Sequence, residues 1–161
     1  MRAGRARRGF TVIELLIAIA VIGILASIGL ASYRPPEARI LANDWNLLVR
    51  QGRYEAIQRN YPVAVVWDPS LAALSTVLDL ASPSVASACS GSTVLRTHGE
   101  ADYPRVSVIS APASVTGIVW LPSGQVRSCT GGVPVAFGMD IDDGRRLVQF
   151  SLTSTGKVEI R

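Results

Sequence analysis

Few side chains in this chain have types and spacing that could do chemistry. His98 is the only histidine, and a lone histidine between a threonine and a glycine is typical of an exposed loop. Asp140, Asp142 and Asp143 cluster in a way that could bind Ca²⁺, although such a cluster is also typical of a polar turn. The sequence contains no nucleophile elbow and no phosphate-binding loop. It therefore predicts a protein that is not an enzyme and that needs no metal or cofactor.

The two cysteines, Cys89 and Cys129, could form a disulfide. Both follow a long apolar segment, so both are exported if the amino terminus stays in the cytoplasm, and an exported pair usually bridges. Closing a loop of this length stabilises a fold by roughly 4 kcal/mol in the chain-entropy model. Two free buried thiols are the alternative. A metal site is disfavoured, because no close cysteine spacing accompanies the single histidine.

One acidic residue, Glu14, lies inside that apolar segment. From Phe10 to Tyr33, 24 residues are otherwise apolar apart from one threonine and two serines. As a helix this segment spans about 36 Å, which is enough to cross a bilayer core. Four arginines precede it, Arg2, Arg5, Arg7 and Arg8. By the positive-inside rule, the amino terminus is cytoplasmic and everything after Tyr33 lies outside.

Glu14 needs an explanation at this depth. A carboxylate inside a membrane costs about 2.5–3.5 kcal/mol on insertion scales, so it requires a partner or a protonated state. Glu14 lies one helical turn from Phe10. If the chain is cut before Phe10, a new amine appears there, and Glu14 of a neighbouring subunit can pair with it. The alternative is a simple membrane anchor in which Glu14 snorkels to the interface.

The run Gly9-Phe10-Thr11-Val12-Ile13-Glu14-Leu15-Leu16 resembles the prepilin motif of type IV pilins and type II secretion pseudopilins. Residues 17–26 are also similar to that family. The resemblance implies that a membrane prepilin peptidase and methylase cuts between Gly9 and Phe10 and N-methylates Phe10. It further implies that Glu14 guides assembly with other pilins by neutralising a neighbour's terminal amine.

Net charge gives little support to a nucleic-acid partner. The formal charge of the whole chain is +4, but residues 1–9 carry four arginines and no acid. Removing them leaves 12 basic side chains (16 minus 4) against 12 acidic ones. Any nucleic-acid site on the mature chain must therefore be a local patch.

The elements that position these residues fall into four segments. We expect a leader peptide at 1–9, a transmembrane and filament-assembly helix at 10–33, an amphipathic stem helix at 34–60 and an exported β-rich head at 61–161. Pro35 and Pro36 should interrupt the helix between the second and third segments. The predicted location is a single pass through the bacterial inner membrane, with the head periplasmic or extracellular.

The stem segment has the spacing of an amphipathic helix over residues 37–60. Its apolar and small residues recur at steps of three and four, at Ala38, Leu41, Trp45, Leu48, Gly52 and Ala56. This stripe is predicted to pack against the head. Arg39, Arg50 and Arg53 fall on the opposite face, either as a solvated surface or as a subunit contact.

Beyond residue 62, short β segments alternate with turn residues. We expect strands at Val63–Trp67, Val94–Arg96, Arg105–Ile109, Gly117–Leu121, Val133–Ile141, Arg146–Leu152 and Lys157–Ile160. Residues 142–144 and 154–156 are typical of hairpin turns, and residues 69–93 of a long connection with a helical turn near Leu71–Leu80. The predicted fold class is α+β, a long amino-terminal helix packed on a small antiparallel sheet, which is the pilin fold that the resemblance implies.

Short runs in the head narrow the resemblance to the GspH/FimT branch of minor pilins. They are Trp120–Gly124, Gly144–Leu147 and Thr155–Val158. The branch implies a minor pilin or pseudopilin, a structural subunit that joins or primes a type IV pilus or a type II secretion pseudopilus.

DNA binding during uptake is the alternative function. Some FimT-type pilins bind DNA through a Gly-Arg-X-Arg element, and here the second arginine after Gly144 comes one place early. The candidate DNA-binding residues are Arg145, Arg146, Lys157 and Arg161. Contacts from these residues would reach phosphates and would be independent of DNA sequence. The expected partners are thus the prepilin peptidase, other pilins, the inner membrane and, in the alternative, DNA.

Overall fold

The computed structural model describes residues 11–32, 36–81 and 84–161. The chain forms two compact units, residues 1–35 and residues 36–161, and each unit is described by itself. The predicted cleavage site at Gly9–Phe10 and the first proline of the predicted interruption, Pro35, lie outside the described residues.

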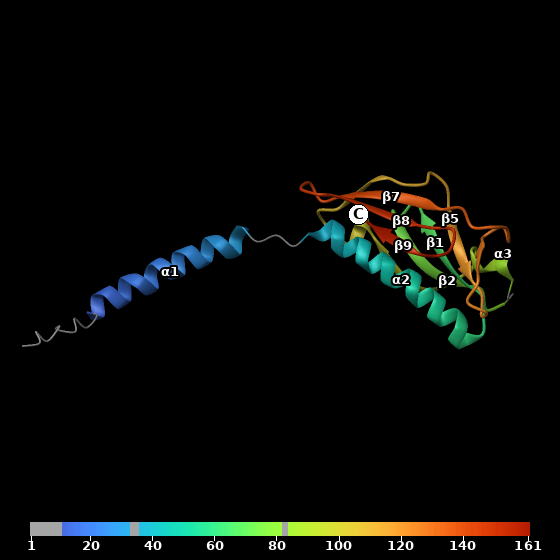
Figure 1. The fold of residues 1–161 in the computed structure, drawn as a ribbon, viewed down its shortest axis with the longest axis horizontal. Helices are drawn as coiled ribbons and strands as arrows, with labels where there is room; N and C mark the ends of the chain where they lie inside the picture. Colours follow the sequence, from blue (N-terminus) through green and yellow to red (C-terminus); the bar gives the residue numbers. More distant parts are fainter. Residues whose placement is uncertain (1–10, 33–35, 82–83) are drawn as a thin grey trace, which may run out of the picture. The chain divides into compact units, whose positions relative to one another are not determined.

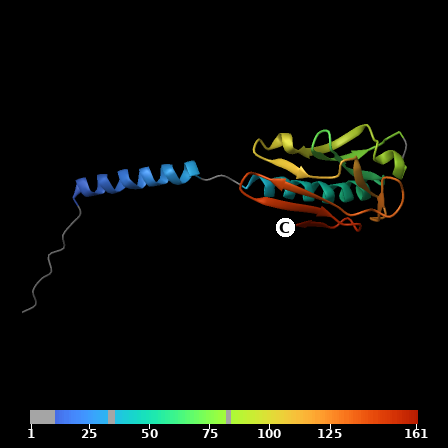
Figure 2. The same ribbon diagram turned by 90° about the horizontal axis from the view of Figure 1, so that it is seen from above.

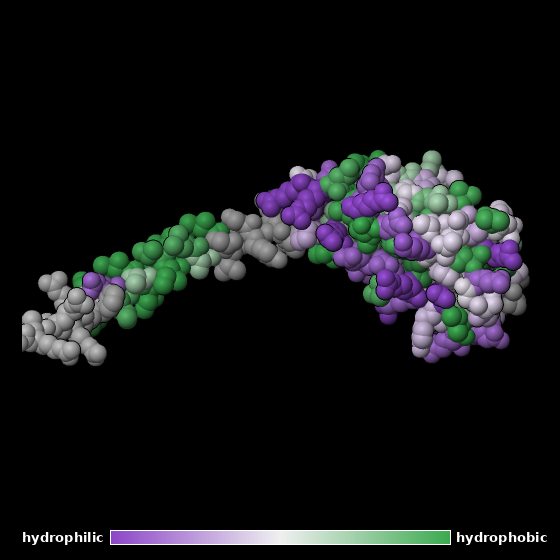
Figure 3. All heavy atoms as spheres, in the orientation of Figure 1, coloured by the Kyte–Doolittle hydropathy of each residue, from purple (hydrophilic) through white to green (hydrophobic). Residues whose placement is uncertain are grey.

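The first unit contains helix α1, Val12–Ser32, with Glu14 as the acidic residue of its first turn. The surface of α1 is hydrophobic along most of its length (Figure 3). Within the described ranges, none of the helices combines the length and apolar character needed to cross a membrane. The predicted membrane segment, residues 10–33, begins and ends outside those ranges.

The second unit begins with helix α2, Glu37–Arg59 (Figure 1). Asn60 ends this helix in the left-handed conformation, with a φ of 52°. The predicted apolar stripe is buried, and Ala42 and Val49 widen it on the same face. The six buried residues of the predicted stripe are Ala38, Leu41, Trp45, Leu48, Gly52 and Ala56. The amphipathic pattern therefore identified the face of α2 that packs against the head.

Two antiparallel sheets pack on α2. The five-stranded sheet has the order β3-β2-β1-β5-β6 and the four-stranded sheet the order β4-β7-β8-β9. The first sheet consists of β1 (Val63–Asp68), β2 (Ala73–Leu78), β3 (Thr93–Gly99), β5 (Thr116–Trp120) and β6 (Val126–Ser128). The second consists of β4 (Ser107–Ser110), β7 (Phe137–Asp142), β8 (Leu147–Leu152) and β9 (Val158–Ile160). Two short helical turns, α3 (Val85–Ala88) and η1 (Glu100–Asp102), flank β3.

Helix α2 contacts strands of both sheets, and Figure 2 shows the sheets on either side of it. Trp45 of α2 lies between Trp67 of the first sheet and Phe150 of the second. Its ring makes edge-to-face contacts with both, at centroid distances of 5.8 Å and 5.3 Å. The indole Nε1 of Trp45 donates to the carbonyl oxygen of His98 at 2.8 Å, so burial leaves no polar atom of Trp45 unpaired. The α+β fold class predicted from the sequence is confirmed.

The helical turn expected near Leu71–Leu80 was wrong, because this region contains strand β2. Strand β2 lies between β1 and β3 and buries residues on both of its faces. An apolar run of this kind cannot be told from a buried helix by periodicity alone. Strand β6 was not predicted. The strand expected from Val133 begins at Phe137, and Pro134 just before it has no backbone N–H to donate to a ladder.

Candidate functional site

The start of α1 is organised around Glu14. The backbone N–H and the hydroxyl of Thr11 donate to Glu14 Oε2 at 3.0 Å and 3.1 Å, and the Glu14 N–H donates to the Thr11 hydroxyl at 3.3 Å. This reciprocal pair is a capping box, in which a threonine and a glutamate three residues later satisfy donors at the helix start. The sequence analysis missed this role, although the Thr-x-x-Glu spacing is its signal.

Between Val12 and Ile28, α1 presents exposed apolar side chains. The large apolar residues from Val12 to Ile28 are between 49% and 77% exposed. Full burial of one such side chain is worth about 1.5–3 kcal/mol. A helix with this surface is suited to burial against other apolar surfaces.

The turn between β7 and β8 reaches the first turn of α2. The Asp143 carboxylate accepts the backbone N–H groups of Arg145 at 3.0 Å and Arg146 at 2.9 Å. The N–H of Ala38, at the start of α2, also helps to lower the pKa of Asp143. Burial alone would raise the pKa of Asp143, but these hydrogen bonds and the Arg146 charge outweigh it and leave the pKa below its usual value. Because the N-cap residue Pro36 has no side-chain cap, Asp143 supplies one.

The Asp142-Asp143-Gly144 segment is thus the hairpin turn that the sequence predicted, with Gly144 at a φ of +76°. Asp142 Oδ1 accepts the Gly144 N–H at 2.9 Å. In the described part of the chain, no group of three or more histidine, cysteine, aspartate and glutamate side chains could hold a metal ion. His98 Nδ1 lies 3.7 Å from Asp102 Oδ2.

The four basic residues proposed for DNA come from the β7–β8 turn and from strand β9 with its flanks, and Arg146 and Arg161 line the same groove. Lys157 Nζ and Arg161 Nη2 each lie 3.2 Å from an oxygen of Glu159. The hydrogen bond from Lys157, together with the charges of Lys157 and Arg161, holds the pKa of Glu159 below its usual value. Arg145 and Arg146 instead lie in the exposed β7–β8 turn.

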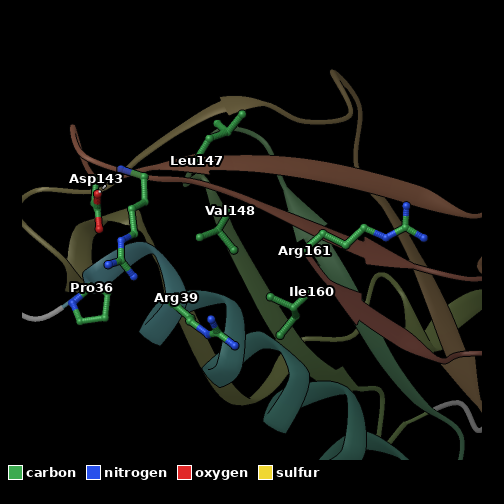
Figure 4. A pocket seen from close by; sticks show the side chains of 8 residues that line it. Pro36, Arg39, Asp143, Leu147, Val148, Ile160 and Arg161 are labelled. Carbon is green, nitrogen blue, oxygen red and sulfur yellow. Dashed lines mark hydrogen bonds between the residues drawn. The ribbon is translucent and has the colours of Figure 1, made fainter.

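Arg146 lines a groove of about 420 Å³ between α2 and the second sheet. Arg39 of α2 lies across the same groove, above an apolar floor of Val148 and Ile160 (Figure 4). The Arg161 side chain points away from Arg39 in this view. Arg146 therefore lines the same groove as Arg161 of the predicted set and Arg39 of α2, whereas Lys157 is not among the lining residues.

Cys89 and Cys129 form a disulfide, as the sequence predicted. Cys89 ends α3, which covers a small apolar cluster on the outer face of the first sheet that includes Val66, Ala88 and Val119. Cys129 follows the edge strand β6. The disulfide therefore ties the α3 segment to the opposite edge of the sheet.

Known proteins resemble the chain in two ways, and the first is its amino-terminal sequence. Residues 4–30 match the prokaryotic N-terminal methylation motif. The type IV major pilin protein PilE of Neisseria gonorrhoeae is 36% identical over 61 residues, which cover 38% of this chain and 36% of PilE. A fimbrial protein of Neisseria meningitidis serogroup B is 38% identical over 55 residues, covering 34% of this chain and 32% of that protein. The chain thus matches about a third of the length of these relatives.

The second resemblance is the fold. The type IV minor pilin FimU of Pseudomonas aeruginosa superposes with a TM-score of 0.52 over 78% of this chain and 88% of FimU, at 16% identity. The fold is that of a pilin. In addition to this fold, the chain carries the amino-terminal methylation motif and is similar to PilE over its amino-terminal part.

Proposed function

We propose that this chain is a minor pilin, a structural subunit that is cut between Gly9 and Phe10, methylated at Phe10 and built into a type IV pilus or a related pseudopilus. The observation that carries the proposal is a methylation motif and a FimU-like head in the same chain. The proposed partners are a prepilin peptidase and other pilins. The GspH/FimT branch indicated by the short runs in the head is part of the same proposal.

Before assembly, the proposed location is the inner membrane, with the amino terminus in the cytoplasm and the head outside. The exposed apolar surface of α1 supports this location, since it would be buried in lipid first and among neighbouring helices in the filament. The Cys89–Cys129 disulfide fits an oxidising compartment outside the cytoplasm.

The two carboxylate oxygens of Glu14 differ in their hydrogen bonds, and this difference supports a role for Glu14 in assembly. Both hydrogen bonds from Thr11 go to Oε2. Among the described residues none donates to Oε1, which leaves this oxygen available. We propose that Oε1 accepts the methylated amine of Phe10 on the neighbouring subunit, while Oε2 continues to cap its own helix.

Three variants separate assembly from capping. Glu14→Gln removes the charge but keeps a side chain that serves in a capping box, so membrane insertion should equal or exceed wild type. Incorporation into filaments should fall roughly tenfold or more, because the neighbour's amine loses its counter-charge. Thr11→Val is the matched control, since it removes the cap and keeps the charge, and it should retain most assembly. Glu14→Val should match Glu14→Gln.

Incorporation is measured by immunoblotting sheared filaments or the secretion complex from the native host against total membrane protein. If Glu14→Gln is incorporated as well as wild type while Thr11→Val fails, Glu14 acts only through its own helix, and the proposed pairing with a neighbour is wrong.

The DNA-binding alternative rests on the four basic residues predicted from the sequence, Arg145, Arg146, Lys157 and Arg161. Because Lys157 and Arg161 share Glu159, about two arginines of the predicted set remain for phosphates, and the expected slope of log K against log salt is near −1.8. This is a weak electrostatic site for one head, so we place the structural role ahead of DNA capture.

A further inference from the structure

A small pocket lies between the carboxyl-terminal half of α2 and strands β2 and β3. It has a volume of about 150 Å³. The residues that line it are Gln51, Glu55, Arg59, Thr76, Leu95 and Arg96. It shares no residue with the groove at Arg39 or with the start of α1, so the function proposed above does not use it.

Thr76 is the most unusual residue of this pocket. It is only 2% exposed, and its hydroxyl oxygen has no hydrogen-bond partner. A buried hydroxyl without a partner costs free energy, which is why nearly all such groups are paired. Valine has almost the same shape and would avoid this cost.

The charges around Thr76 favour an anion. Arg96 is directly opposite Thr76 in the antiparallel pairing of β2 and β3, so the two side chains lie on the same face of the sheet. Arg59 is paired with Glu55, with Nε to Oε2 at 2.5 Å. Among the described residues Arg96 has no ion-pair partner and the Gln51 amide no hydrogen bond. The pocket thus holds two guanidinium groups against one carboxylate.

We propose that this pocket binds a single carboxylate group. The Arg96 guanidinium can hold both carboxylate oxygens in a bidentate pair. The Thr76 hydroxyl and the Gln51 amide supply further donors, and Leu95 packs against the carbon that carries the group. The volume fits a small carboxylate or one acidic side chain and not a larger ligand. The carboxylate is either a free small acid or a glutamate or aspartate presented by a neighbouring chain.

The test uses the full chain in detergent and follows the Arg96 Nε–H and Thr76 methyl resonances by NMR. Sodium acetate is titrated against sodium chloride at constant ionic strength, and inorganic phosphate is a third arm. Two peptides, acetyl-Ala-Glu-Ala-amide and acetyl-Ala-Gln-Ala-amide, distinguish a presented side chain from a free acid. The variants are Arg96→Gln, Thr76→Val and, as a matched control, Arg127→Gln on the exposed edge strand β6.

We expect acetate and the Glu peptide to shift both resonances saturably, with no response to chloride or the Gln peptide. Arg96→Gln should raise the Kd about tenfold or more, and Thr76→Val about threefold or more. Arg127→Gln should leave it unchanged. Thr76→Val should also raise the Tm without ligand, which separates a binding role from a packing role. A Glu peptide that binds more tightly than acetate would assign the site to a neighbouring chain, and equal Kd values would assign it to a free acid.

The proposal is overturned if neither carboxylate shifts these resonances, or if Arg96→Gln and Arg127→Gln bind acetate equally. Tighter binding of phosphate than of either carboxylate would overturn the assignment to a carboxylate. Carboxylate binding that is unchanged in Thr76→Val would show that the hydroxyl is satisfied by water and serves no ligand.

Discussion

Asp143 connects two parts of the head that are far apart in the sequence. Its carboxylate accepts N–H groups from its own turn and from the start of α2. We predict that Asp143→Ala lowers the free energy of unfolding by about 1–2 kcal/mol, the range for a lost helix cap with its turn bonds. Asp142→Ala is the control, because the hydrogen bond that the Asp142 carboxylate accepts comes from Gly144 in the same turn, and this variant should cost less. Urea denaturation of the two variants compares them, and equal losses would contradict the capping role.

The pH dependence of this cap follows from the sign of the pKa shift. Since the pKa of Asp143 is lower in the folded chain than in the unfolded chain, its charge stabilises the fold fully above the unfolded value of about 3.9. That stabilisation disappears as the pH falls through the folded value. Asp143→Asn should therefore be less stable than wild type at pH 7 and converge with it in strong acid. A stability difference that stayed constant with pH would contradict this assignment.

Gly156 lies where the β8–β9 turn meets the first sheet. An added Cβ would lie 2.5 Å from the Trp120 ring, and the residue has a φ of +77°. We predict that Gly156→Ala costs roughly 2–5 kcal/mol, from backbone strain and overpacking together. Gly144→Ala is a matched control, because Gly144 has a φ of +76° and no atom within 4 Å of an added Cβ. Thermal unfolding should show the larger loss of stability for Gly156→Ala. Equal losses for the two variants would contradict overpacking, because the Trp120 ring would then move aside without a measurable cost.

Single residues were predictable from the sequence where the chain offers few possible partners. The Cys89–Cys129 pair could be predicted because the chain has two cysteines, and both follow a segment that is predicted to cross a membrane. The role of Asp143 could not, since the helix that it caps begins more than a hundred residues earlier and only the folded head brings them together. For the same reason the sequence grouped Arg146 with Lys157 instead of Arg39.

Among the elements, α2 was the most predictable. Its stripe repeats at helical spacing and is buried as expected, because one face of a helix packed on a sheet must be apolar. Strand β2 was less predictable because both of its faces are covered, one by α2 and the other by the α3 segment. Such a strand loses the alternation that distinguishes β structure in a sequence.

The disulfide is the link between elements that a simple experiment can remove. It joins residues 40 apart in the sequence, and loop closure of this length is worth roughly 4 kcal/mol. We predict that the Cys89→Ser, Cys129→Ser double variant loses stability of that order, because its unfolded chain is no longer constrained by a closed loop. The urea midpoint checks this prediction, with mass mapping of non-reduced wild-type peptides as the control for bridge formation. An unchanged midpoint would contradict it.

The whole molecule combines two units with different surfaces. Helix α1 exposes apolar side chains, whereas the head buries its apolar residues around Trp45 between two sheets. The head has an apolar core of its own. The resemblance to type IV pilins could be predicted from about thirty residues at the amino terminus, because the motif there is local. The two-sheet arrangement could not, since it depends on pairings between distant strands.

The central claim is that the chain is processed as a pilin and assembled, and the amino terminus of the assembled protein tests it most directly. Filaments or secretion complexes are isolated from the native host, and the protein is measured by intact mass and peptide mass spectrometry. We predict a chain that begins at N-methylated Phe10, 14 Da heavier at that residue than an unmodified one. Protein that is present in the assembled fraction and still begins at Met1 would contradict the claim.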